Sequence, residues 1–219
     1  MKNIARLFVI MFFLCTVPLN AQKPKNMAPG VERWPIKISV HRLYETPKDV
    51  SFDNLIALPG PNGVTKNDPR YQDAFIPSFS NSLNLREGDM VSVSGWLHLV
   101  AFETDGDYHI QISNSDTAGD HCLIVEVPYP RYIKKAPNLK KLFTNVRNFI
   151  KKNLLNKAEP SQSGTILKDA AYVTVTGQLF YDDSHVGDPP RGKKGMHAAT
   201  LWEIHPITDI HLTKAPANQ

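Results

Sequence analysis

The stretch VTVTGQLFYDDSHVGDPPRGKKGMHAATLWEIHP, residues 173–206, predicts two strands separated by a long polar loop. Small or apolar side chains occupy every second position at the start of residues 173–180, the period-2 pattern of a half-buried strand. Residues 200–204 are rich in β-branched and aromatic side chains and predict the second strand. Loops as long as the one between them are usually functional or disordered, so we expect a site here. Its ionisable residues are Asp182, Asp183, His185, Asp188, Arg191, Lys193, Lys194 and His197.

Three further strands are predicted upstream, at residues 90–103, 108–113 and 121–127. In the first of them Gly95 indicates a bulge or a sharp bend. The Asp-Gly pair at residues 105–106 predicts a tight turn between the first two strands.

The hydrophobic period changes to that of a helix at about residues 137–156, where Pro137 suits the first turn. This segment and its flanks carry many lysines and no acid. A basic amphipathic helix can lie on anionic lipid or face a polyanion. The alternative is that the lysines are the solvated face of a helix that caps a barrel. The apolar positions are Leu139, Leu142, Phe143, Val146, Phe149, Ile150 and Leu154.

Five strands with a helix between the third and the fourth have the element order of the OB-fold. We therefore predict a mainly β chain with an OB-fold-like five-stranded barrel and an N-terminal extension. The competing interpretation is another small antiparallel barrel or sandwich with one helix. The predicted organisation is a signal peptide (1–21), a flexible leader (22–32), an extended segment packed on the barrel (33–88), the OB-like domain (89–213) and a tail (214–219).

The N-terminus has the features of a secretory signal peptide. Basic residues precede an apolar run at residues 7–17, and Ala21 marks the expected cleavage site. The run is shorter than the ~20 residues of a membrane span, and no other segment of the sequence could cross a bilayer. We therefore predict an exported protein, periplasmic or secreted. Phe13 and Leu14 precede Cys15 where a lipoprotein would have small residues, so lipid anchoring is not expected.

Removal of the signal peptide would leave Cys122 as the one cysteine, so no intramolecular disulfide is expected. Cys122 lies in an apolar strand, which predicts a small buried hydrophobe and not a reactive thiol. The exported part, about 200 residues long, must then depend on one well-filled hydrophobic core.

The alternation within the strands predicts which side chains leave the core. The side chains expected to point inward are those of Tyr108, Ile110, Ile112, Leu123, Val125, Val127, Trp202 and Ile204. The outward side chains of three strands would then share one solvated face. That face would contain Asp107, His109, Glu126, Glu203 and His205, with Asp183 and His185 at its rim.

Carboxylates mixed with imidazoles suit a divalent transition metal or a general acid/base pair. The candidate metal ligands are His109, Glu126, His185, Glu203 and His205. The candidate residues for binding an anionic or polar ligand are Asp105, Asp107, Asp183, Arg191, Lys193 and Lys194. The alternative is an ordinary solvated sheet face beside an ordinary Asp-Gly-Asp turn, since no HExxH or CxxC motif is present.

These residues leave three functions open. A module that binds a small or polymeric anionic ligand comes first, followed by a metal-dependent hydrolase of the phosphodiesterase or nuclease kind and by a structural envelope protein. Convergence of three or more of the carboxylates and imidazoles within metal-binding distance would favour the hydrolase. Nucleic-acid binding would need stacking aromatics, for which Trp96, Phe180 and Tyr181 are the candidates.

The sharpest expectation concerns His109 and His205. Neighbouring strands lie about 5 Å apart, so we expect the two rings to be neighbours across the sheet with Glu126 between them. His109→Ala is then expected to abolish metal-dependent stabilisation without unfolding the barrel.

Six segments resemble a scattered group of exported or soluble bacterial proteins with the pattern RWPvK, E-D-D-H, E-iP, TG-lFFD-H and E-lHPv. The group has no established function, so the resemblance implies one folded unit and no activity. Its recurring polar positions fall at Glu103, Asp105, Asp107, His109, Glu126, Asp183, His185, Glu203 and His205. The segments are ERWPIK (32–37), LPGP (58–61), ETDGDYHIQI (103–112), LIVEVPYP (123–130), VTVTGQLFYDDSH (173–185) and WEIHPI (202–207).

The chain is also similar to secreted nucleases of the staphylococcal type in its expected fold alone. Their arrangement of carboxylates and two arginines has no counterpart here. No catalytic role is therefore carried over from them.

Overall fold

The computed structural model describes residues 32–117 and 121–217. The predicted signal peptide and nearly all of the predicted leader lie outside these residues, so export stays a prediction. The strands are β1 (Lys48–Asp49), β2 (Met90–Phe102), β3 (Tyr108–Ser113), β4 (Cys122–Val127), β5 (Thr165–Tyr181) and β6 (Ala198–Leu212). The α-helices are α1 (Trp34–Lys37), α2 (Phe52–Ile56) and α3 (Pro137–Leu154), and short 3-10 turns lie at Pro69–Tyr71, Pro130–Tyr132 and Asp183–His185.

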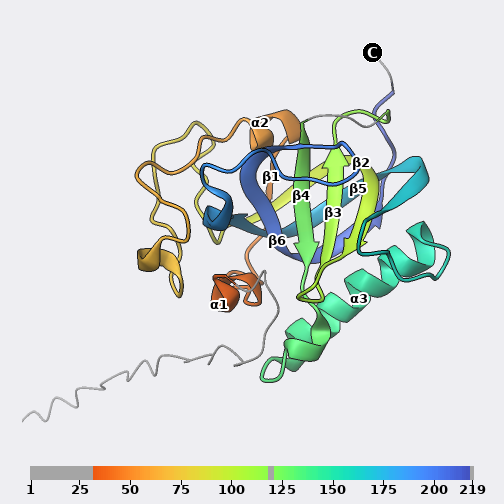
Figure 1. Ribbon diagram of the computed structural model, residues 1–219, viewed down its shortest axis with the longest axis horizontal. Helices are drawn as coiled ribbons and strands as arrows, with labels where there is room; N and C mark the ends of the chain where they lie inside the picture. The colour runs from red at the N-terminus through yellow and green to blue at the C-terminus, as the bar shows by residue number, and fades with distance from the viewer. Residues whose placement is uncertain (1–31, 118–120, 218–219) are drawn as a thin grey trace, which may run out of the picture.

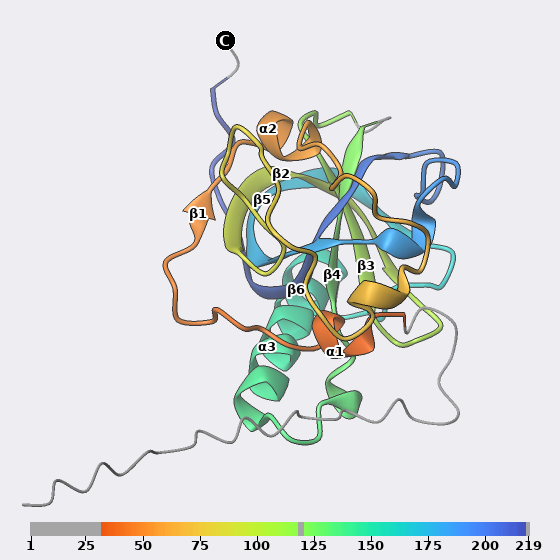
Figure 2. The ribbon, with the colours of Figure 1, turned by 90° about the vertical axis from the view of Figure 1, so that its left-hand side faces the viewer.

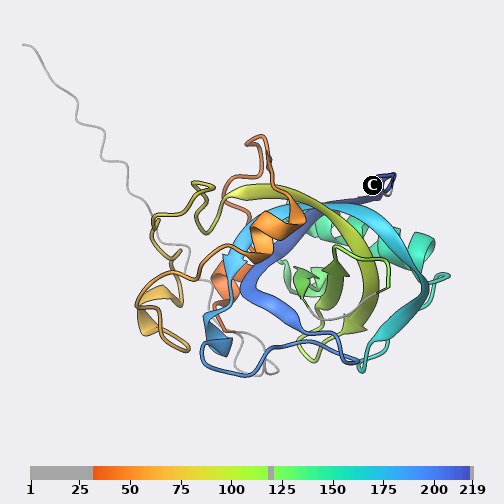
Figure 3. The ribbon, with the colours of Figure 1, turned by 90° about the horizontal axis from the view of Figure 1, so that it is seen from above.

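The sheet closes into a barrel. Its strand order is β1-β2-β3-β4-β6-β5, and the additional β2–β5 pairing closes β2 to β6 into a five-stranded ring, with β1 attached to β2 (Figure 1, and from above in Figure 3). Among the five strands of the ring, β4 and β6 run parallel and the other neighbours are antiparallel, while the short β1 pairs with β2 in parallel. With α3 between β4 and β5, this is the OB-fold order, which confirms the predicted fold class.

The last strand is longer than expected. The sequence pattern suggested that it ends near Pro206, whereas β6 continues to Leu212 and pairs there with Val173. Pro206 has no N–H to donate, and it lies where the register of the β5–β6 ladder shifts. An irregular ladder at this point accommodates the proline without ending the strand.

The barrel interior has the predicted parity. The side chains expected to point inward from β3, β4 and β6 are all buried, including Tyr108, Val125 and Trp202. α3 packs on one end of the barrel through Phe143 and its apolar neighbours (Figure 1), and α2 packs on the other end. No α-helix among the described residues is long and apolar enough to cross a bilayer.

The apolar side of α3 faces the barrel, so most of its lysines are exposed, as the solvated-face interpretation expects. Arg147 is the exception among the basic residues of this helix. It is buried, donates a hydrogen bond to the Gly106 carbonyl at 2.8 Å, and its guanidinium lies 3.5 Å from the centre of the Tyr108 ring. Arg147 therefore ties α3 to the β2–β3 turn.

The extended segment at residues 33–88, orange to yellow in Figure 2, runs along the outside of the barrel. It shares the barrel's core, to which Leu55, Ile76 and Leu85 contribute buried side chains. Its attachment centres on Arg33. The Arg33 guanidinium donates to both carboxylate oxygens of Glu87, at 2.7 and 2.8 Å. Further donations to the carbonyls of Tyr71, Ala74 and Tyr181 use the remaining N–H groups.

Gly177 permits a close approach of β5 to β6. A Cβ at this position would lie 2.4 Å from the Pro206 carbonyl oxygen and 2.5 Å from a methyl carbon of Ile204. Gly177→Ala is expected to lower the free energy of unfolding by about 1–3 kcal/mol, because the two backbones must separate. Urea denaturation measures this. Lys168→Ala, exposed on the same strand, is the control, and equal stability of the two variants would contradict the prediction.

Candidate functional site

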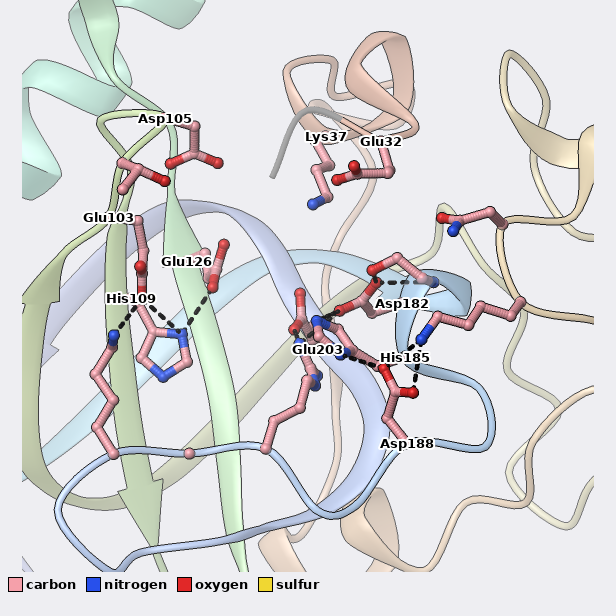
Figure 4. A pocket seen from close by; sticks show the side chains of 17 residues that line it. Glu32, Lys37, Glu103, Asp105, His109, Glu126, Asp182, His185, Asp188 and Glu203 are labelled. Carbon is pink, nitrogen blue, oxygen red and sulfur yellow. Dashed lines mark hydrogen bonds and ion pairs between the residues drawn. The ribbon is translucent and has the colours of Figure 1, made fainter. Parts of the chain in front are cut away.

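A cavity of about 590 Å³ opens on the outer face of the barrel, where β3, β4 and β6 lie side by side. α1, the β2–β3 turn, residues 66–67 and the loop between β5 and β6 complete its lining (Figure 4). Its charged lining residues are the acids Glu32, Glu103, Asp105, Glu126, Asp182, Asp188 and Glu203, the bases Lys37, Lys66, Arg191 and Lys193, and the imidazoles His109 and His185.

The polar face beneath this cavity is buried, not solvated as the alternation of the strands suggested. His205 is 1% exposed and Asp107 is fully buried. The physical reason is that the β5–β6 loop folds back over the sheet. In that loop, the Lys193 amide donates to Gln111 Oε1 at 2.7 Å, and the Met196 carbonyl accepts from Gln111 Nε2 at 3.3 Å.

Asp107, Glu126 and His205 form a group that could hold a metal ion. One ligand atom of each lies within 4.8 Å of the other two, and residues 32–117 and 121–217 contain no second such group. The carboxylate oxygen Oδ1 of Asp107 accepts the Tyr129 amide at 2.8 Å, which fixes the orientation of that side chain. Within the described chain, Asp107 Oδ2 and both ring nitrogens of His205 are buried and have no hydrogen-bond partner.

His205 is surrounded by carboxylates. Its Nε2 lies 3.6 Å from Asp107 Oδ2, and its Nδ1 lies 3.3 Å from Glu126 and 3.5 Å from Glu203. Burial lowers the pKa of His205, but the negative charges of Asp107, Glu203 and Glu126 outweigh it and raise the pKa to about 9. Without a metal, the positive charge of the imidazolium partly balances the negative charges of these acids. Metal binding would displace the proton from His205.

Glu126 joins the two histidines, as expected from the strand order. Its Oε1 lies 2.9 Å from His109 Nδ1, and its Oε2 faces His205. The other nitrogen of His109 lies 3.3 Å from Gln111 Oε1, which already accepts from Lys193. Burial lowers the pKa of His109, yet Glu126 outweighs burial and raises it. His109 therefore donates to Glu126 and orients it.

Arg191 holds the wall on the β6 side. Its Nη1 lies 2.5 Å from Asp182 and 2.6 Å from Glu203. Burial lowers the pKa of Arg191, but the two carboxylates outweigh burial and raise it. Lys193 forms a similar pair with Glu103 at 3.0 Å. These pairs leave Glu203 beside the metal-capable group but bound to a guanidinium.

Three predicted site residues lie away from the group of Asp107, Glu126 and His205. His185 is at the cavity rim, where it contacts Asp188 at 3.2 Å. Lys194 is exposed and does not line the cavity. Asp183, at the start of the 3-10 turn, is buried and does not line the cavity. Its carboxylate accepts a hydrogen bond from the Asp68 amide at 2.8 Å and so anchors the N-terminal segment.

Two residues that line the cavity, Lys37 and Asp105, have properties that the sequence did not predict. Lys37, on α1, was visible only through the resemblance of the ERWPIK segment. Burial lowers the pKa of Lys37, but the nearby acids, Asp182 first, outweigh burial and raise it, so the amine stays charged. Asp105 was expected to bind a ligand. Burial, then Asp107 and Glu126, raises its pKa to about 7.

The candidate stacking residues are not available to a nucleic acid in this cavity. Phe180 and Tyr181 are buried, and Trp96 packs against Tyr172 with ring centres 5.1 Å apart. Among the described residues, no Phe, Tyr or Trp lines the cavity.

Cys122 is buried, as predicted, and its sulfur accepts a hydrogen bond from Gln111 at 3.2 Å.

His109→Ala is expected to weaken metal binding by about 10- to 100-fold, which is the usual effect of losing a group that orients a ligand. It should not abolish binding, because His109 contacts Glu126 but does not belong to the three-residue group. Isothermal titration with Zn²⁺ measures the change. An unchanged affinity would show that Glu126 needs no support from His109.

Comparisons with protein-family models, curated proteins and solved structures find no match for this chain. No activity is therefore transferred from a relative. The inference of function rests on the geometry and the charges of the cavity.

Proposed function

We propose that this barrel is a metal-dependent hydrolase that acts on a phosphate ester. The observation that carries the proposal is the convergence of Asp107, Glu126 and His205, of which Glu126 lines the cavity and the other two lie buried beneath it. Asp107 Oδ2 and both ring nitrogens of His205 lack hydrogen-bond partners in the described chain. Two carboxylates and one imidazole are a donor set for a divalent transition metal such as Zn²⁺ or Mn²⁺.

The charge of the cavity supports a cation at its floor. Seven acids line it against four lysines and arginines. Lys66, Arg191 and Lys193 each lie within about 3 Å of a lining carboxylate. An anionic substrate alone would meet this excess of negative charge, whereas a divalent cation would offset it. Metal and anion therefore fit the cavity together better than the anion by itself.

The side chains around the floor match the needs of ester hydrolysis. A bound divalent cation would supply Lewis-acid stabilisation of the charge that develops on the phosphoryl oxygens. Asp105 lines the cavity next to this group and is the carboxylate placed to take a proton from the attacking water, whose oxygen forms the new bond to phosphorus. The ester P–O bond breaks, and the proton passes to the departing alcohol oxygen.

The size and lining of the cavity favour a small substrate. Its volume falls within the range of small-molecule sites. A polynucleotide substrate would call for aromatic side chains on which bases stack, and none lines the described cavity. A low-molecular-weight phosphate ester is therefore the better fit.

A second candidate is a module that binds metal and ligand without turnover. The observation that favours it is the ion pairing of Arg191 with Asp182 and Glu203, which leaves the guanidinium less free to follow developing charge. A structural role without a ligand has less support, because the polar face forms the floor of a cavity and not a flat surface.

The experiment uses the full chain, stripped with EDTA and then titrated with Zn²⁺ or Mn²⁺. We expect a single ion per chain and metal-dependent release of p-nitrophenolate from bis(p-nitrophenyl) phosphate. Asp107→Asn should lose both. Metal binding without turnover of this and other phosphate esters would favour the binding module. Failure to bind any metal would remove the proposed function.

A further inference from the structure

We infer that Lys37 forms the anion subsite of this cavity and binds a phosphoryl oxygen of the substrate opposite the metal-capable group. The inference rests on the proposed function and names its substrate contact. It also assigns part of the site to the N-terminal segment, which lies outside the barrel. Four observations support it.

The first observation is that α1 is held rigidly. Arg33 immediately precedes α1, is buried, and donates five hydrogen bonds to Glu87 and to three backbone carbonyls. Lys37 lies four residues later, one helical turn on, so both side chains share a face. The Phe180 ring lies under both, 4.9 Å from the Arg33 guanidinium and 5.7 Å from the Lys37 ammonium.

The second observation is the direction of the Lys37 side chain. In Figure 4 its ammonium points from α1 into the cavity, while His109 and Glu126 lie on the opposite wall. Asp182, Glu126, Glu203 and Asp105 all act electrostatically on Lys37. The charge of this lysine is therefore near the floor where the metal would bind.

The third observation is depth. Lys37 is 7% exposed. The side chains of Lys66 and Lys193, the other lining lysines, are 48% and 25% exposed. Lys66 and Lys193 belong to the rim, where they can attract an anion but are well solvated. Lys37 is the lysine that an anion on the cavity floor would meet.

The fourth observation is chemical. A buried ammonium on α1 and a divalent cation held beneath Glu126 would place positive charge on two sides of a bound group. A tetrahedral phosphoryl group offers several charged oxygens, so it can contact both at once, and lysine binds phosphate as a point charge. The substrate class that fits is a phosphate ester of small size.

The test measures binding of inorganic phosphate to the full chain loaded with Zn²⁺, by isothermal titration. Lys37→Met should weaken phosphate binding by about 10- to 100-fold, the effect of losing one charge-assisted hydrogen bond. Zn²⁺ affinity should stay equal or increase, because a nearby positive charge is removed. Lys37→Arg should retain most of the phosphate affinity. Lys140→Met, exposed on α3, is the matched control and should behave as the wild type.

The outcomes separate a failure of the Lys37 contact from a failure of the metal site. Zn²⁺ binding with phosphate affinity unaffected by Lys37→Met would overturn the role of Lys37 and leave the metal site intact. Zn²⁺ binding without any phosphate binding would likewise overturn the role of Lys37 and leave the metal site intact. Absence of Zn²⁺ binding would remove the proposed function together with this inference. Circular dichroism verifies folding, and if Lys37→Met does not fold, Lys37→Gln takes its place.

Discussion

Replacing His205 by alanine is expected to abolish the stabilisation of the barrel by Zn²⁺ or Mn²⁺. His205 supplies one of three ligand atoms, and both of its nitrogens face carboxylates and not hydrogen-bond donors. Loss of an orienting group alone weakens metal binding by about 10- to 100-fold, so loss of a ligand should exceed that. A metal at 100 times its Kd stabilises a protein by about 2.7 kcal/mol, and this gain should disappear in the variant.

The measurement is a thermal melt of the wild type and His205→Ala with and without metal. For a chain of this size, a gain of about 2.7 kcal/mol raises Tm by roughly 5–10 °C. His211→Ala is the matched control, since His211 is on the same strand but exposed and paired with Asp209. A shift of similar size in His205→Ala and in the control would contradict a metal at Asp107, Glu126 and His205.

Replacing Arg33 by methionine is expected to lower the free energy of unfolding by about 3–5 kcal/mol. The side chains of Arg33 and Glu87 are 1% and 0% exposed, and removal of one partner leaves a buried charge uncompensated. The backbone carbonyls of Tyr71, Ala74 and Tyr181 would also lose their donor. Urea denaturation measures the loss, and α1 with its Lys37 should become less well fixed.

Two further variants test whether the buried Arg33–Glu87 pair is the cause of this loss of stability. Arg33→Met combined with Glu87→Leu should be less destabilised than the sum of the two single changes, because no charge remains buried. Arg42→Met removes an arginine whose side chain is 30% exposed and paired with Glu45 and, at 3.5 Å, with Asp89. Asp89 keeps its pairs with Lys48 and Arg86, so this variant should change stability by less than about 1 kcal/mol. If Arg33→Met behaved like Arg42→Met, the buried pair would not be what holds α1.

The barrel itself could be predicted from local pattern. Period-2 alternation identified the inward residues of β3, and a change to helical spacing located α3 between the third and fourth barrel strands. These signals are local, because each depends on side chains a few residues apart. The parity of β3, β4 and β6 also placed Glu126 between His109 and His205, since it follows from strand order alone.

The cover over this polar face could not be predicted. Its burial depends on the β5–β6 loop, which Gln111 holds over the sheet from 82 residues away. The cavity above it also depends on α1, which is positioned by a contact between Arg33 and Glu87, 54 residues apart. The role of Asp183 depends likewise on Asp68, 115 residues away. Periodicity contains no information on such distant pairs. A solvated face was therefore expected where the chain forms a cavity, and Asp183 was assigned to a ligand instead of to the N-terminal segment.

The most direct test is the location of a metal ion in crystals of the full chain grown with Mn²⁺ or Zn²⁺. Anomalous scattering should place a single ion among Asp107, Glu126 and His205, about 2.0–2.3 Å from one atom of each. Asp105 and Lys37 should lie on its open side, facing the cavity. An ion bound elsewhere, or no ion at these residues at saturating metal, would contradict a metal-dependent site in this barrel.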